Sequence, residues 1–216
     1  AILKLYPLLS NIAKERIFTE LKKLITGKNA GKILAEYKDV FTFIMPRLST
    51  LLEDKYFENT KRIKTEDTAL SFALLFDGLS GDIAGEILSS LKSDGELKRR
   101  VKTLIEEKDT DISDEIKLSH YLRKKEEKDA ERLILYRFML DAITKDEKER
   151  LLSLLGKVKD ECIRIKDLEL TGTDLIKLGF SGSHIGDALE KLLDDVVEKR
   201  CENEKDALLE HIKSCK

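Results

Sequence analysis

The stretch that decides the fold is residues 170–193, which read LTGTDLIKLGFSGSHIGDALEKLL. Four glycines, Gly172, Gly179, Gly182 and Gly186, fall within this segment of a chain that is otherwise rich in helix-forming residues. A glycine inside a helix destabilises it by roughly 0.5–1 kcal/mol relative to alanine, so a cluster marks turns or places where another backbone comes close. The segment therefore predicts short helices joined by glycine turns.

The rest of the chain shows the same helical periodicity. Its 216 residues are 38% charged and include only two prolines. Apolar residues recur at helical spacing almost everywhere, and strand-like alternation is nearly absent. The sequence therefore predicts an all-α protein. No apolar run approaches the ~20 residues of a membrane span, and the first residues lack the layout of a signal peptide, so we expect a cytoplasmic protein with no membrane partner.

Helices are expected at positions set by these patterns. The predicted ranges are 10–26, capped by Ser10 or Asn11, then 29–44, 62–77, 118–140, 183–199 and 203–214, the last capped by Asn203. Residues 108–115, where Asp and Thr crowd, are expected to form a flexible link that proteases cut. A last helical unit, beginning near residue 150, is expected to fold around Leu168, Leu170, Leu175, Ile176, Leu178, Ile185, Leu189, Leu192 and Leu193.

Residues that carry catalytic chemistry are hard to find. Cys162, Cys201 and Cys215 form no C-x-x-C pair, and His120, His184 and His211 lie far apart without a metal-ligand partner at helical spacing. No P-loop, H-E-x-x-H motif or nucleophile elbow occurs. We therefore expect no catalytic residue, no metal site and no bound cofactor within this chain.

A segment with similar glycine spacing occurs earlier in the chain. GLSGDIAGEIL (78–88) repeats the spacing of GFSGSHIGDAL (179–189). A helix start exposes backbone N–H groups and a partial positive charge, so a loop without bulky side chains lets a phosphate approach. Asp82 would repel a phosphate at the first loop, whereas Ser183 and His184 would not at the second. The second loop is the better candidate, turn and packing glycines remain the alternative, and Gly182→Asp is expected to spare the fold.

Residues 170–212 resemble the tail of bacterial CCA-adding tRNA nucleotidyltransferases, in the poly(A) polymerase and tRNA nucleotidyltransferase family. The family pattern is roughly L-x-G-N-D-L, then G-x-x-G-x-x-I-G-x-x-L-x-x-L-L, then N-E-x-x-x-L. The matching residues are Gly172, Asp174, Leu175, Gly179, Gly182, Ile185, Gly186, Leu189, Leu192, Leu193, Asn203, Glu204 and Leu208. Thr173 replaces the usual Asn, and Ser181 and Ser183 replace common prolines.

Two further segments resemble the same family. NIAKERIFTELKKLITGKNAGKIL (11–34) is similar to its neck, with Glu15, Arg16, Ile17, Glu20, Leu21, Leu24 and Ile25 on the pattern. ALSFALLFDG (69–78) resembles a degenerate HD-like helix of the family's body, with Phe76 where a metal-binding HD protein has His before Asp77. This difference argues against a metal phosphohydrolase of the HD type.

The resemblance implies an elongated, multi-helical arrangement: the end of a neck over 1–45, a body over 46–150 and a tail over 151–216. It also implies that Mg²⁺ and CTP or ATP bind a catalytic head, whose motif, a G-S loop followed by D-x-D, does not occur here. The implied partner is tRNA, held through its backbone at the acceptor stem, T arm and elbow. An alternative from another class is a catalytically orphaned helical module that binds protein.

The residues expected to contact RNA come from two places. Basic side chains supply affinity for the phosphate backbone without reading sequence. A first group lies in a predicted basic turn, and a second lies in or beside the second glycine loop. The predicted contacts are Lys98, Arg99, Arg100, Lys102, Lys177, Gly182, Ser183, His184 and Gly186. Arg123, Lys124 and Lys125 form another basic turn.

Overall fold

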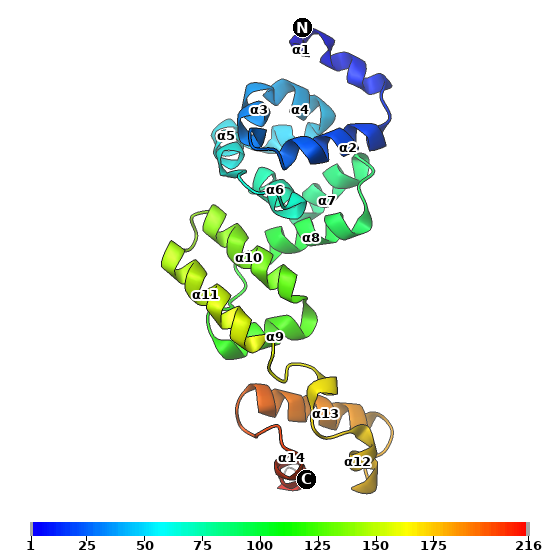
Figure 1. Cartoon of the computed structure of the whole chain (residues 1–216). Coiled ribbons are helices and arrows are strands. Elements are labelled where there is room, and N and C mark those ends of the chain that lie inside the picture. The colour runs from blue at the N-terminus through cyan, green and yellow to red at the C-terminus, as the bar shows by residue number, and fades with distance from the viewer. Residues whose placement is uncertain (1, 215–216) are drawn as a thin grey trace. The chain divides into compact units, whose positions relative to one another are not determined.

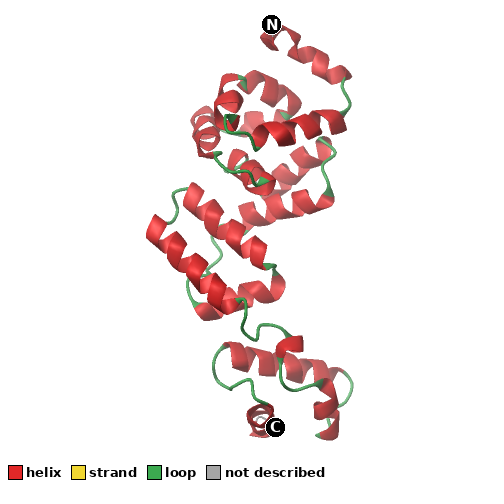
Figure 2. Cartoon of the chain, viewed as in Figure 1, coloured by secondary structure: helices red, strands yellow, loops and turns green. Residues whose placement is uncertain are grey.

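The computed structural model describes residues 2–214, and Cys215 lies outside them. Over these residues the chain is all-α, as the periodicity predicts, with no strand and only an isolated bridge between Asp77 and Leu79 (Figure 2). The chain divides into two compact units, residues 1–110 with 132–148 and residues 111–131 with 149–216. The predicted division into neck, body and tail stays a prediction.

The first unit is a cluster of short helices (Figure 1). Its elements are α1 (Ile2–Leu5), η1 (Tyr6–Asn11), α2 (Lys14–Ile25), α3 (Ala30–Glu36), α4 (Lys38–Ile44), η2 (Pro46–Thr50), α5 (Glu53–Arg62), α6 (Thr68–Leu75), α7 (Gly81–Ser90), α8 (Gly95–Glu106) and most of α10 (Glu127–Met139). Every residue of α6 from Ala69 to Leu75 is buried, and α8 packs against both α6 and α7. An apolar helix in the middle of the unit is thus covered by amphipathic neighbours.

The second unit ends in a small helical tail. Its elements are α9 (Glu115–Lys124), most of α11 (Lys145–Val158), η3 (Ile165–Asp167), α12 (Gly172–Lys177), α13 (Ser183–Val197) and α14 (Lys205–Ser214). The tail core holds five of the predicted residues, and Leu178, Ile185 and Leu189 pack beside it. The buried core residues are Leu168, Leu170, Leu175, Ala188, Leu192, Leu193, Val197, Leu208 and Ile212. Ile176 was predicted wrongly, because its side chain is 58% exposed.

Several predicted helix limits are wrong. The helix expected from residue 10 begins at Lys14, after a 3-10 turn that contains Ser10 and Asn11. The helix expected over 29–44 breaks at Tyr37, whose backbone leaves the helical region at φ −111° and ψ 35°. The helix expected over 118–140 breaks at Lys125, which is extended at φ −132° and ψ 161°. Neither break carries a glycine or proline, so tertiary packing overrides the local pattern.

Asn203 was predicted as the cap of the last helix, and the structure gives it another task. Its side-chain oxygen accepts a hydrogen bond from the Glu169 N–H at 3.0 Å, and its amide donates to the Asp167 carbonyl at 2.9 Å. Asn203 therefore satisfies two backbone groups that lie more than thirty residues earlier. This double hydrogen bond holds the segment before α12 against the start of α14.

The segment expected to be a flexible link is held by side chains. Arg137 donates to the carbonyls of Lys108, at 2.5 Å, and of Thr110 within the first unit. Arg150 donates to the Ser113 carbonyl at 2.8 Å within the second unit, where Ile112 is buried. The segment therefore joins the two units, as expected of a link, with each half tied by hydrogen bonds to its own unit, and whether proteases cut it stays to be tested.

Trypsin tests how firmly this segment is held. We expect slow cleavage after Lys108 in the unmutated chain and much faster cleavage in Arg137→Ala, because that change removes the donor that holds the local backbone. Cleavage should be timed by mass spectrometry under native conditions. Arg47→Ala is the control, since Arg47 makes only an exposed ion pair with Glu86. Equal rates after Lys108 in all three proteins would refute this role of Arg137.

Candidate nucleic-acid interface

The start of α13 is open to ligands. Its N-cap is Gly182, which offers no side-chain hydrogen bond, and the first turn contains no acidic residue. Gly182, Ser183, His184 and Gly186 are all exposed. The first backbone N–H groups of an α-helix have no intrahelical partner and carry the positive end of the helix dipole. Four of the predicted residues therefore meet at one exposed, electropositive helix start.

The matching loop before α7 is less suited to binding a phosphate, as expected, but Asp82 is only part of the reason. Ser80, and not Asp82, is the N-cap, and its hydroxyl accepts a hydrogen bond from the Ile83 N–H at 3.3 Å. Asp82 lies in the first turn and pairs with Lys102 at 2.6 Å. The start of α7 is thus satisfied by its own side chains, which leaves less for a phosphate to bind.

Gly182 and Gly186 respond differently to substitution. Gly182 has φ +59° and ψ −138°, a conformation that side chains strongly disfavour. Gly182→Asp would therefore strain the loop, so the expectation that it spares the fold is wrong. A Cβ added to Gly186 meets no heavy atom within 4 Å. Gly186 is consequently the position at which a side chain can be introduced without disturbing the backbone.

Lys177 lies at the other side of the glycine loop. It ends α12, which packs against α13, and its side chain is 74% exposed. The nearest carboxylate, Asp174, is 3.9 Å from the Lys177 Nζ and also pairs with Lys205 at 2.9 Å. The Lys205 hydrogen bond holds the pKa of Asp174 well below its usual range. Asp174 therefore stays charged and is shared between two lysines.

The first predicted group, Lys98 to Lys102, is not a basic turn. These residues lie inside α8, where Lys98 and Lys102 share a face and Arg100 points to another. Arg100 pairs with Glu96 at 2.5 Å, and Lys102 pairs with Asp82 at 2.6 Å and with Glu106 at 3.6 Å. The four cations therefore do not form one patch, because their charges are divided between helix faces and partly neutralised.

Asp77 lies where an HD protein would hold a metal. Its carboxylate is 6% exposed and contacts Lys55 at 2.6 Å and Lys108 at 3.3 Å. Burial raises the pKa of this carboxyl, but the Lys55 hydrogen bond and the Lys108 charge outweigh burial and lower the pKa below its usual value. Two ammonium groups would repel a divalent cation, and nowhere in residues 2–214 are three or more His, Cys, Asp or Glu side chains grouped to bind one. The residues therefore do not fit a metal site.

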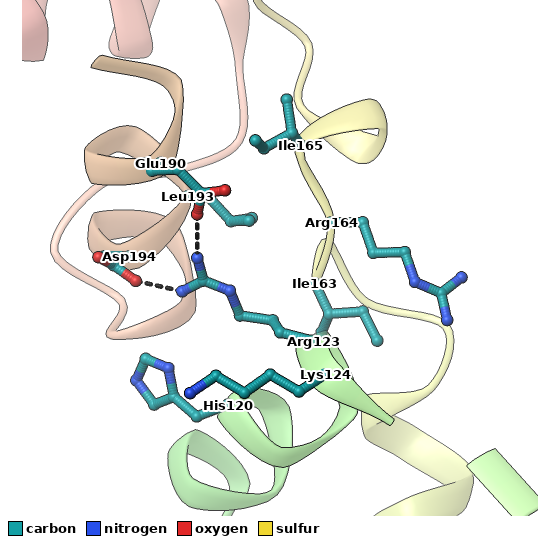
Figure 3. Close-up of a pocket in the computed structure, with 9 residues that line it drawn as sticks. All are labelled: His120, Arg123, Lys124, Ile163, Arg164, Ile165, Glu190, Leu193 and Asp194. Atoms are coloured by element: carbon teal, nitrogen blue, oxygen red, sulfur yellow. Dashed lines mark hydrogen bonds and ion pairs between the residues drawn. The ribbon is translucent and has the colours of Figure 1, made fainter. Parts of the chain in front are cut away.

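A cavity of about 610 Å³ lies in the second unit beside α9 and α13 (Figure 3). Arg123, at the end of α9, donates to both Glu190 and Asp194 of α13. Lys124 and Arg164 also line the cavity, and no carboxylate pairs with either within the described part of the chain. The basic turn Arg123 to Lys125 pointed to this site, but the carboxylates that meet Arg123 are 67 and 71 residues away.

Comparison with models of protein families shows to which family the chain belongs. The family model for tRNA nucleotidyltransferase domain 2 matches residues 61–212, which is well over half of the chain. The chain belongs to the tRNA nucleotidyltransferase family. A second model, described as "Probable RNA and SrmB- binding site of polymerase A", matches residues 1–51. No curated protein matches the chain.

Within this tRNA nucleotidyltransferase family member, both units contribute to the first match. The match covers α6 to α14 and therefore includes Asp77, the cavity and the start of α13. The second match covers the segment that resembles the family's neck. Together the two matches support an RNA partner. None of the helices in the described part of the chain is long and apolar enough to cross a membrane.

Proposed function

We propose that this chain is the tRNA-binding C-terminal part of a CCA-adding or A-adding tRNA nucleotidyltransferase of the cytoplasm. Its role would be to hold the acceptor stem, T arm and elbow of tRNA through the phosphate backbone. The observation that carries the proposal is the pair of family matches, which follow one another along the chain at 1–51 and 61–212.

The open start of α13 supplies a chemistry for this role. Backbone N–H groups at an uncapped helix end bind phosphate oxygens, and Ser183 and His184 add side-chain donors beside them. Lys177 supplies a nearby exposed charge on α12. Contacts of this kind position an RNA duplex without reading its sequence. Such contacts suit a protein that must accept many different tRNAs.

Nucleotide addition would need parts that these 216 residues do not contain. We propose that Mg²⁺ and CTP or ATP bind a catalytic head that carries a G-S loop followed by D-x-D, a motif that is absent from this sequence. Two metal ions held by such carboxylates would stabilise the attacking and leaving oxygens. The residues described here would bind and orient the tRNA during that step.

A combined binding and transfer assay tests the proposal. We expect the purified chain to bind tRNA and to incorporate no CMP or AMP into it with any divalent metal, because no carboxylate pair in the required loop context is present. Binding can be followed by fluorescence anisotropy and incorporation with labelled nucleotides. Incorporation above the background of a mock preparation, or failure to bind tRNA, would refute the proposal.

One observation favours the second candidate, a protein-interaction module. A cavity of about 450 Å³ in the first unit is lined mainly by apolar side chains of η1, α2, α3, α4 and the residues between them, among them Ile12, Leu24 and Ile33, none of which is buried. Exposed apolar surface of this kind often marks a protein contact. The two candidates separate on tRNA binding, since a module that binds only protein would not bind tRNA at low salt.

A further inference from the structure

The cavity beside α9 and α13 is lined by more positively charged side chains than carboxylates. Glu190 and Asp194 are its only carboxylates, and both are taken up by the guanidinium of Arg123. His120, Lys124 and Arg164 also line it, and only His120 faces a carboxylate, Glu198, at 3.8 Å. Lys124 and Arg164 are therefore the cations that remain available to an anionic ligand.

The rest of the lining is apolar. Ile163 is 5% exposed and Leu193 is 2% exposed, so both form a fixed wall, and Ile165 lies beside them (Figure 3). The volume of about 610 Å³ falls within the usual range of ~300–1,000 Å³ for a small-molecule site. A ligand that fits must combine negative charge with a partly apolar body, and a ribose-phosphate unit has both properties.

The side chains that line the cavity also favour binding of the sugar-phosphate backbone of a nucleic acid over binding of its bases. No Phe, Tyr or Trp lines the cavity, and its one ring, that of His120, lies 3.8 Å from the Glu198 carboxylate, so an unpaired base would find at most a single stacking partner. Two separate cations, one from α9 and one from the segment before η3, can instead each contact a phosphate. The chemistry thus matches a sugar-phosphate backbone and gives no basis for reading sequence.

We propose that this cavity binds the sugar-phosphate backbone of an RNA strand, with Lys124 and Arg164 contacting phosphates and the ribose lying on Ile163 and Ile165. Arg123 acts as a positioning residue, because its ion pairs with Glu190 and Asp194 fix α9 against α13 at the cavity edge. This inference rests on the proposed function and adds a site distinct from the start of α13.

The test compares charge-removing variants of the full chain. Lys124→Gln with Arg164→Gln should weaken tRNA binding about tenfold and reduce the slope of log affinity against log salt by roughly 1.4 to 1.8, the value for two lost phosphate contacts. Lys61→Gln with Lys213→Gln, which removes two exposed charges elsewhere, should change the slope by much less.

A second variant acts in the opposite direction. Glu190→Gln with Asp194→Asn removes both negative charges while leaving amide oxygens that can still accept hydrogen bonds from Arg123, so tRNA binding should tighten and its salt dependence should steepen. Weaker binding by this variant, or an unchanged slope in Lys124→Gln with Arg164→Gln, would overturn the cavity assignment. Those results would leave the proposed function standing if the unmutated chain binds tRNA, whereas a chain that binds no tRNA would end both.

Discussion

Gly186→Glu is expected to weaken tRNA binding roughly 10- to 100-fold, the range for loss of a charge-assisted hydrogen bond. The new carboxylate would stand in the first turn of α13, where a phosphate must approach the exposed N–H groups. The tail should remain folded, because a Cβ at Gly186 meets no heavy atom within 4 Å. A negative side chain near a helix start is also favourable for the helix itself. Fluorescence anisotropy measures the affinity, and circular dichroism checks the fold.

Two control variants are needed. One separates the effect of the added charge from that of side-chain size, and the other tests whether the effect is specific to the start of α13. Gly186→Gln introduces a side chain of the same size without charge and should bind tRNA far better than Gly186→Glu. Gly85→Glu places the same change at the matching position of α7, where a Cβ likewise meets no heavy atom within 4 Å. If Gly186→Glu binds tRNA as tightly as the unmutated chain, the start of α13 contacts no phosphate and its glycines serve only turns and packing.

Asp77→Asn is expected to lower the free energy of unfolding of the first unit by about 2–3 kcal/mol, the range for loss of a buried charged hydrogen-bond partner. The change leaves Lys55 and Lys108 without their shared carboxylate and disturbs the Tyr136 hydroxyl, which lies 3.4 Å from it. Urea unfolding followed by circular dichroism measures the effect.

The matched control is Asp82→Asn. Asp82 and Asp77 both contact a lysine at 2.6 Å, but the Asp82 side chain is 79% exposed, so its ion pair is screened by water. Asp82→Asn should therefore change stability far less than Asp77→Asn. Equal losses of stability in the two variants would show that the burial of Asp77 adds nothing to the strength of its ion pairs.

The pH dependence of stability follows from the direction of the pKa shift at Asp77. Its pKa in the folded protein lies below the value of 3.8 that it has without the protein environment. The stabilisation is therefore fully present above that value and is lost as pH falls through the lower, folded pKa. The difference in stability between Asp77→Asn and the unmutated chain should be constant near neutral pH and shrink in acid.

The sequence predicts what depends on local periodicity. Leu189, Leu192 and Leu193 repeat at helical spacing; Leu192 and Leu193 lie in the tail core, and Leu189 packs against it. The open start of α13 was also visible in the sequence, because no acidic residue falls in the first turn after Gly182. These features depend on which residues stand close together in the chain.

What the sequence does not predict depends on contacts between distant segments. The sequence predicts Lys102 as an RNA contact. In the structure its ammonium group pairs with Asp82 of α7, which lies twenty residues away in sequence. Arg123 meets Glu190 across 67 residues, and Asn203 meets Glu169 across 34. The positive φ of Gly182 likewise follows from how the loop enters α13, which the spacing of glycines alone does not determine.

The central claim is that this member of the family holds tRNA through its phosphate backbone. The most direct test measures equilibrium tRNA affinity of the unmutated chain between low and physiological salt, with two tRNAs of unrelated sequence. Four phosphate contacts would give a slope of log affinity against log salt of about −3 to −4. We predict such a slope and nearly equal affinities for both tRNAs. Affinity that does not change with salt, or that differs strongly between the two sequences, would contradict the account.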